Sequence, residues 1–167
     1  AACGAGVDLC VASLLVGDEG KVLGVDITPA MVEKARSNAL SAGLSNITVY
    51  EGAFEDLPVE SGVLNVVISN GSINLSSDKE AVFSEIYRVL EAGGHLYFAD
   101  MIKDENNPEA DCCKGESWAD CVAGTLRRDE LVRIMEEVGF VDVRLLGTNH
   151  YRTSPSTIGA TFAATKG

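Results

Sequence analysis

The spacing of apolar positions along the chain predicts helices that alternate with short buried strands. Apolar residues recur at helical spacing in residues 7–16, 29–42, 79–92 and 129–138. Short apolar runs of strand length lie at residues 21–26, 47–50, 64–70, 95–100, 141–146 and 159–164. Alternation of strands and helices predicts a parallel sheet with right-handed crossovers, which the last two strands close.

Residues at the predicted helix ends agree with this order. Thr28-Pro29 suits the N-cap and the first position of a helix. The sequence Ser77-Asp78-Lys79-Glu80 matches a capping box, in which Ser77 caps the helix and Glu80 bonds back to the serine amide. We expect Gly93-Gly94 to end that helix.

A glycine-rich loop before the first predicted helix carries the first functional signal. Gly4-Ala5-Gly6 precedes the helix, and Asp26 ends the next strand about 20 residues later. Glycines let the backbone approach a ligand, amides at a helix N-terminus attract anionic groups, and the acid suits two ribose hydroxyls. The pattern predicts the nucleotide half-site of a doubly wound α/β domain. Leu9 stands where the hydride-transfer fingerprint has its third glycine.

A loop of this kind needs a strand in front of it, and only Ala1 and Ala2 remain of that strand. The strand would be central in the sheet, so its loss would remove ladder hydrogen bonds on both sides. We therefore expect a truncated first strand. Either the full gene product carries upstream residues, or a neighbouring chain completes the sheet in a strand-complementing homodimer.

Length, charge and cysteine usage narrow the class of protein. The length suits a single domain over residues 1–167, and 46% hydrophobic residues suit a buried sheet. A net charge of -12 argues against nucleic acid and anionic membranes as partners. No apolar run approaches about 18 residues, so we expect no membrane span. Five cysteines, an odd number, favour free thiols in a reducing, cytoplasmic compartment.

The pattern changes in the second half of the chain, after Met101. Residues 103–126 are predicted to form an insertion on the substrate side, in which a polar, acidic, mobile loop leads to a short helix near residues 117–124. Cys112, Cys113 and Cys121 lie within ten positions of one another there.

Five stretches, in the same order along the chain, resemble class I S-adenosylmethionine-dependent methyltransferases. They are residues 2–6, 24–28, 51–58, 64–70 and 87–94. The resemblance implies a Rossmann-like, mostly parallel sheet and S-adenosylmethionine as cofactor. By position it implies cofactor contacts from the glycine loop and three later strand ends: Gly4, Ala5, Gly6, Asp26, Ile27, Ala53, Phe54, Glu55 and Asn70. Asp26 would accept both ribose hydroxyls, Phe54 and Glu55 would flank the adenine, and Asn70 would face the methyl donor.

Three further stretches, residues 7–10, 68–79 and 117–126, resemble the arsenite methyltransferases. That family binds trivalent arsenic through cysteine thiolates, and soft thiolates do select soft centres. The resemblance implies methyl transfer to thiol-bound arsenite, with a thiol reductant as partner. The arsenic lone pair attacks the methyl group, so no general base is needed. Of the two cysteines that match the family, Cys121 is the implied arsenic ligand and Cys10 a redox-active or packed thiol. Cys112 and Cys113 would add sulfurs around the metalloid.

Other interpretations stay open. The general motifs suit equally a methyltransferase for a small organic acceptor, such as a quinone-type carbon or an amine, and only the cysteines argue against it. The truncated start suits a non-catalytic fragment that binds metalloids without methyl transfer. At single positions, Asp26 could only cap the next turn, Phe54 could be a core residue, and Cys112-Cys113 could be an incidental exposed pair.

Overall fold

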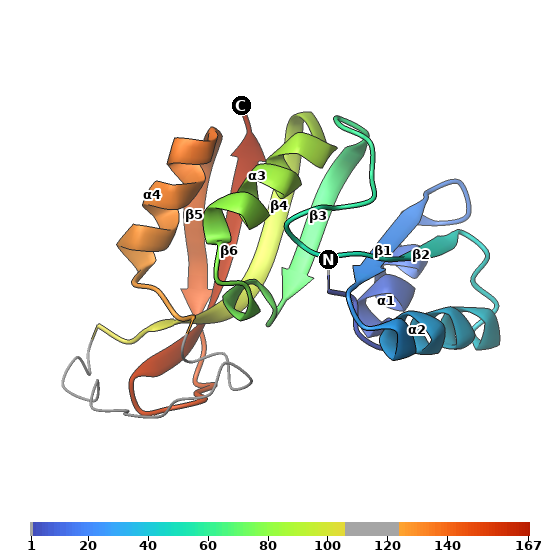
Figure 1. The fold of residues 1–167 in the computed structure, drawn as a ribbon, viewed down its shortest axis with the longest axis horizontal. Coiled ribbons are helices and arrows are strands. Elements are labelled where there is room, and N and C mark those ends of the chain that lie inside the picture. The colour runs from blue at the N-terminus through green and yellow to red at the C-terminus, as the bar shows by residue number, and fades with distance from the viewer. Residues whose placement is uncertain (1, 106–123) are drawn as a thin grey trace. The chain divides into compact units, whose positions relative to one another are not determined.

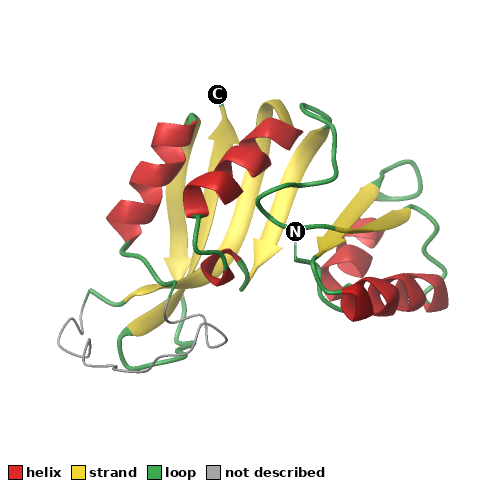
Figure 2. Ribbon diagram, viewed as in Figure 1, coloured by secondary structure: helices red, strands yellow, loops and turns green. Residues whose placement is uncertain are grey.

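The computed structural model describes residues 2–105 and 124–167. The chain divides into two compact units, residues 1–59 and 60–167, and each is described by itself. Both units contain helices and strands (Figure 2). The organisation as a single domain over residues 1–167 stays a prediction.

The first unit is a pair of parallel strands with two helices. Its elements are α1 (Val7–Val16), β1 (Val22–Asp26), α2 (Pro29–Ser41) and β2 (Ile47–Glu51) (Figure 1). The strands β1 and β2 are parallel and pair residue by residue from Val22 with Ile47 to Asp26 with Glu51. Both helices contact both strands. The apolar faces meet in one core cluster, which consists of Leu9, Val22, Val32, Ala35 and Val49.

The helix α2 begins and ends as the sequence predicts. Thr28 is the N-cap in extended conformation and Pro29 is the first helical residue, although the Thr28 hydroxyl makes no capping hydrogen bond. At the other end, Gly43 adopts a left-handed φ of 71°. Its conformation lets the amide of Leu44 bond back to the carbonyl of Ala39 at 3.1 Å, which satisfies a carbonyl of the last turn.

The second unit is a four-stranded sheet in the order β3-β4-β6-β5. Its elements are β3 (Leu64–Asn70), the 3₁₀ turn η1 (Ile73–Leu75), α3 (Lys79–Val89), β4 (Leu90–Lys103), α4 (Arg128–Val138), β5 (Phe140–Thr148) and β6 (Thr157–Lys166). The strands β3 and β4 are parallel, whereas β6 runs antiparallel to both β4 and β5. The carboxyl ends of β3 and β4 therefore lie at one edge, where β6 begins.

Helices α3 and α4 pack against each other on the same face of this sheet (Figure 1). Phe83 of α3 is fully buried. Its ring centroid lies 5.8 Å from that of Phe98 and 6.5 Å from that of Phe140. Phe98 stacks in turn on Phe162 of β6 at 5.0 Å. These aromatic contacts hold α3, β4, β5 and β6 together as one core.

The predicted α/β fold class is confirmed, and two local predictions are wrong. The N-cap of α3 is Asp78, not Ser77, because the Asp78 carboxylate accepts the hydrogen bond from the amide of Ala81 at 2.9 Å. Gly93-Gly94 does not end the helix, because α3 already ends at Val89. The strand β4 begins at Leu90, and residues 91–94 bulge out of its pairing with β3.

Candidate functional site

The glycine loop of the first unit, residues 4–6, is fixed by hydrogen bonds to the elements around it. The amide of Gly4 donates to Oδ2 of Asp26 at 2.8 Å. Nδ2 of Asn38, on α2, donates to the carbonyl oxygen of Ala5 at 2.9 Å. Just before the loop, the amide of Cys3 donates to the carbonyl oxygen of Val25 at 2.9 Å. These bonds hold the loop against the carboxyl end of β1.

Both loop glycines adopt backbone conformations that other residues avoid. Gly4 has a φ of 51° and Gly6 a φ of 86°. A Cβ on Gly6 would lie 3.0 Å from the Cβ of Ala35, so glycine is needed here for the close approach of α2 as well. A Cβ on Gly4 would meet nothing within 4 Å. The loop is therefore open at Gly4. Gly6 is the N-cap residue of α1, and it has no side chain that would cover the first amides of this helix.

Asp26 connects the end of β1 to the loop. Its side chain is buried, with 8% exposed. Oδ2 accepts from Gly4, and Oδ1 accepts from the amide of Thr28 at 2.9 Å. Asp26 thus does cap the turn after β1, which was the alternative interpretation, and it also fixes Gly4. Each carboxylate oxygen has a second lone pair, so capacity for hydroxyl donors remains. Its ribose-binding role stays a prediction.

Cys3 is a half-buried thiol beside this carboxylate. Burial raises the pKa of Cys3 above the ordinary thiol value, and the negative charge of Asp26 raises it further. Its Sγ contacts the carbonyl oxygen of Gly4 at 3.8 Å. Since the thiolate is the reactive form, these surroundings make Cys3 a poor nucleophile and a poor soft ligand.

The predicted adenine-binding residues lie at the same end of the two strands. The amide of Gly52 donates to the carbonyl of Asp26 at 3.1 Å, so the loop after β2 begins beside the end of β1. Ala53 pairs with Asp56 across a tight turn, and the residues between them are half-buried Phe54 and exposed Glu55. Ile27, directly after Asp26, is 69% exposed. The first unit thus brings the glycine loop, Asp26 and this turn to one edge.

The thiol predictions are only partly within reach of the structure. Cys10 is a free, half-buried cysteine in the first turn of α1, and its amide donates to the carbonyl oxygen of Gly6 at 3.0 Å. Cys112, Cys113 and Cys121 lie outside the described residues, as does most of the predicted insertion at residues 103–126. Within residues 2–105 and 124–167, no group of three His, Cys, Asp or Glu side chains could hold a metal ion.

In the second unit, the carboxyl end of β3 carries exposed Asn70. Beyond it, the amide of Gly71 donates to the carbonyl oxygen of Ala99 at 2.8 Å and so extends the ladder with β4. The buried hydroxyls of Ser69 and Ser72 bond to each other at 2.9 Å. The predicted contact of Asn70 with the methyl donor stays a prediction.

Two buried polar residues at this edge, Asn74 and Asp100, are not among the site residues that the sequence predicts. Asn74 is 3% exposed and Asp100 is 7% exposed. Burial raises the pKa of the Asp100 carboxyl above its ordinary value, while hydrogen bonds from the amides of Met101, Asn74 and Ile73 and from the Asn74 side chain lower it. The available signal was an acid at the end of a predicted strand, the same position that Asp26 has in the first unit.

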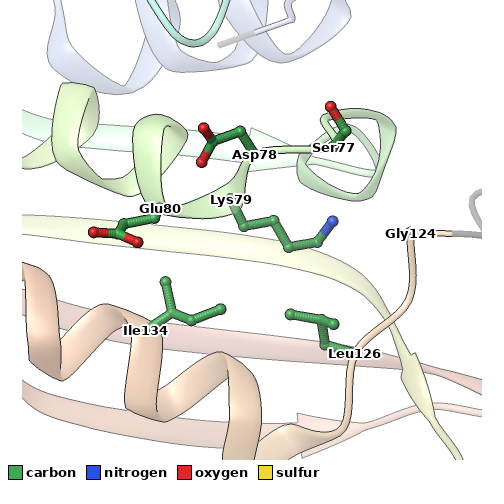
Figure 3. A pocket seen from close by; sticks show the side chains of 7 residues that line it. All are labelled: Ser77, Asp78, Lys79, Glu80, Gly124, Leu126 and Ile134. Atoms are coloured by element: carbon green, nitrogen blue, oxygen red, sulfur yellow. The ribbon is translucent and has the colours of Figure 1, made fainter.

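A cavity of about 380 Å³ lies at the start of α3 in the second unit (Figure 3). Its lining residues are Ser77, Asp78, Lys79, Glu80, Gly124, Leu126 and Ile134. Lys79 is buried, and its Nζ donates to the carbonyl oxygen of Ser76 at 3.0 Å. None of the predicted site residues that the structure describes lines this cavity.

The described part of the chain has no helix with the length and apolar character that crossing a lipid bilayer requires.

Comparison with known proteins identifies the family. Residues 1–139 match a family described as "Methyltransferase domain". The arsenite methyltransferase of Halobacterium salinarum is 38% identical over 142 residues, which cover 85% of this chain and 36% of that protein. The Homo sapiens arsenite methyltransferase is 37% identical over 156 residues, which cover 87% of this chain and 41% of that protein. The chain thus spans well under half of the length of both curated relatives.

A solved structure agrees with these relatives. The crystal structure of an arsenic(III) S-adenosylmethionine methyltransferase from Chlamydomonas reinhardtii superposes on this chain with a TM-score of 0.79 at 33% sequence identity. The superposed residues make up 98% of this chain and 60% of the Chlamydomonas chain. These comparisons confirm the resemblance of the sequence to the S-adenosylmethionine-dependent methyltransferases and to the arsenite methyltransferases among them. The chain belongs to the methyltransferase domain family, with the α/β fold of the class I S-adenosylmethionine-dependent methyltransferases.

Proposed function

We propose that the chain methylates trivalent arsenic, held by cysteine thiolates, with S-adenosylmethionine as the methyl donor. One observation carries the proposal: the Asp26 carboxylate accepts a hydrogen bond from Gly4 and so fixes an open glycine loop at the end of β1. The chain that contains this loop has arsenite methyltransferases among its relatives. The substrate class is inferred from those relatives, each of which is much longer than this chain.

The first unit fits a nucleoside ligand with a charged amino-acid tail. The space next to Gly4 is open within 4 Å of where a Cβ would lie. The first amides of α1 suit a carboxylate, because a helix N-terminus attracts negative charge. Asp26 keeps lone pairs for ribose hydroxyls, and exposed Ile27 offers an apolar surface to an adenine. Phe54 and Glu55, at the tip of the turn after β2, are the proposed flanking residues.

S-adenosylmethionine, when bound, supplies an electrophilic methyl group. The chain has to hold the acceptor and orient it toward that group. Cys121 is the proposed arsenic ligand, and Cys112 and Cys113 are proposed as further sulfur ligands. Trivalent arsenic has its own lone pair and loses no proton, so no side chain has to act as a general base. Asn70 is the proposed contact with the methyl donor from the second unit.

We also propose a role for Cys10 and a cellular compartment for the chain. Cys10 is half-buried just behind the glycine loop, so a redox role, with reduction by a small thiol, and a packing role both suit it. We also propose a cytoplasmic, reducing compartment, which would keep the five cysteines of the chain as thiols.

The proposal is tested by the products formed from arsenite, a small thiol and S-adenosylmethionine. Cys121→Ser should abolish the formation of methylated arsenicals, because a serine oxygen is a hard donor and does not retain a thiophilic centre. Ser37→Ala, an exposed change on α2, should leave product formation unchanged and serves as the matched control.

The same assay separates the other interpretations. Turnover with a quinone or an amine that Cys121→Ser does not affect would make the chain a methyltransferase for organic acceptors. Binding of arsenite without any methylated product would favour a thiol module that binds metalloids. Either result contradicts the proposed function.

A further inference from the structure

Asn74 and Asp100 form a buried pair at the carboxyl edge of β3 and β4. The Asn74 side-chain amide, Nδ2, donates to Oδ1 of Asp100 at 2.8 Å and to the carbonyl oxygen of Met101 at 2.7 Å. The backbone amide of Asn74 donates to Oδ2 of Asp100 at 3.1 Å. The amide of Met101 donates to Oδ1 of Asp100 at 2.8 Å. Both hydrogens on Nδ2 of Asn74 are therefore donated in hydrogen bonds, and both carboxylate oxygens of Asp100 accept hydrogen bonds.

This pair fixes the turn that follows β3. Asn74 is the middle residue of η1, so its bonds tie η1 to the end of β4. At the start of the turn, the amide of Gly71 is already bonded to Ala99. The segment from Asn70 to Leu75 is thus hydrogen-bonded to β4 near both of its ends.

Holding a turn does not by itself require a buried charge. Burial of a carboxylate costs free energy that several hydrogen bonds only partly offset, and backbone bonds or apolar packing can fix a turn without that cost. The other buried charges of this edge have partners of their own. Lys79 bonds to the carbonyl of Ser76, and Asp104 pairs with Arg152 at 2.7 Å. Burial of the Asp100 carboxylate is therefore costly, and within residues 2–105 and 124–167 Asn74 is the side chain that hydrogen-bonds to it.

We infer that Asn74 and Asp100 are positioning residues for methyl transfer, which hold Asn70 and the turn at residues 71–75 in the geometry that the reaction requires. The inference rests on the proposed function, in which Asn70 contacts the methyl donor. Neither residue of the pair needs to touch substrate. A displacement of about 1 Å at a reacting centre can lower a rate about a hundredfold, so a rigid anchor has kinetic value.

The test replaces Asn74 by residues that break the pair in two different ways. Asn74→Asp sets a second carboxyl against Asp100, and two adjacent carboxyls share a proton more readily than either ionises alone. Asn74→Ser removes the Nδ2 donor and adds no charge. Asn65→Asp is the matched control, because Asn65 also bonds to a carboxylate, that of Glu91, but is exposed on β3.

Methyl transfer per folded molecule and hydrogen exchange of the amides of residues 71–75 are measured from about pH 8 downward, through the range in which a coupled carboxyl pair takes up a proton. In Asn74→Asp, we expect transfer to fall at least about tenfold at the higher pH, together with weaker protection of these amides relative to their intrinsic exchange at the same pH. Both the rate and the protection should recover as the pH falls. Asn74→Ser should be slower at every pH, and Asn65→Asp should behave as the unmodified chain.

Three outcomes would overturn the inference. The pH profile of Asn74→Asp could parallel that of the unmodified chain. Both Asn74 variants could lower only the melting temperature and leave the rate per folded molecule unchanged. The third outcome applies if the unmodified chain methylates nothing, which contradicts the proposed function. The pair is then tested by the affinity for S-adenosylmethionine, and the inference is rejected if the affinity of Asn74→Asp does not recover as the pH falls.

Discussion

The substitution Asp26→Asn separates the structural role of this carboxylate from its proposed ligand-binding role. Asp26 is buried, and its two oxygens accept hydrogen bonds from the amides of Gly4 and Thr28. Asparagine has nearly the same shape, but its amide has only one oxygen. Its NH₂ group must therefore face one of the two backbone donors.

Both consequences have an expected size. A buried donor left without an acceptor costs about 1–3 kcal/mol, so the free energy of unfolding should fall by about that amount. A hydrogen bond to a charged acceptor contributes about 1.5–3 kcal/mol, and weakened ribose contacts should lower the affinity for S-adenosylmethionine about tenfold to a hundredfold. Asp18→Asn, in the exposed turn before β1, should change neither quantity.

Urea unfolding measures the first effect, and titration calorimetry with S-adenosylmethionine measures the second. If Asp26→Asn loses stability but binds the ligand with unchanged affinity, Asp26 only fixes the turn, and the ribose-binding role is refuted. If neither quantity changes, the hydrogen bonds described for Asp26 do not contribute as argued.

Three further predictions follow from the two units. Gly6→Ala should lower the free energy of unfolding by about 2–4 kcal/mol in urea, because alanine at a φ of 86° costs about 1–2 kcal/mol and its Cβ would press on Ala35. Phe83→Ala should cost about 3–5 kcal/mol in the same assay, because it empties the centre of the second core. Burial raises the pKa of the Cys3 thiol, so the folded chain holds this proton more tightly than the unfolded chain. Stability should therefore fall as the pH rises above about 8.5, and Cys3→Ser should reduce that slope.

Matched variants make these predictions specific. Gly43→Ala also places alanine at a left-handed φ, of 71°, but nothing lies within 4 Å of its Cβ, so only about 1–2 kcal/mol should be lost. Leu146→Ala removes an exposed side chain and should change stability by less than about 0.5 kcal/mol. Equal losses at Gly6 and Gly43, or at Phe83 and Leu146, would contradict the packing described for the two cores. An unchanged pH slope in Cys3→Ser would contradict the burial argument.

Much of the fold could be predicted from the sequence, because local signals and tertiary packing agree. The helix at residues 7–16 and the strand at residues 64–70 were predicted with their observed bounds. The errors lie where two local choices compete. Ser77 and Asp78 are both good caps, and only the hydrogen bond to Ala81 decides between them. Gly93-Gly94 is a common helix end, but pairing of Leu90 with Leu64 begins the strand earlier.

The candidate site was predictable where one short motif carries it. The glycine loop and Asp26 are near in sequence, and the structure joins them through the Gly4 amide. The support from Asn38 of α2 was not predictable, because a side chain that bonds to a loop carbonyl 33 residues away leaves no periodic signal. The Asn74–Asp100 pair was missed for the same reason, since its members belong to different elements that only the sheet brings together.

The central claim is methyl transfer to arsenic, and the most direct measurement uses S-adenosylmethionine with a trideuterated methyl group. The chain is incubated with arsenite, a small thiol and the labelled donor. The arsenic species are then separated, and their masses are measured by mass spectrometry. The account predicts methylated arsenicals that carry the full deuterium label, and their absence with Cys121→Ser. Labelled product that still forms with Cys121→Ser, or label that appears only on an organic acceptor, would contradict it.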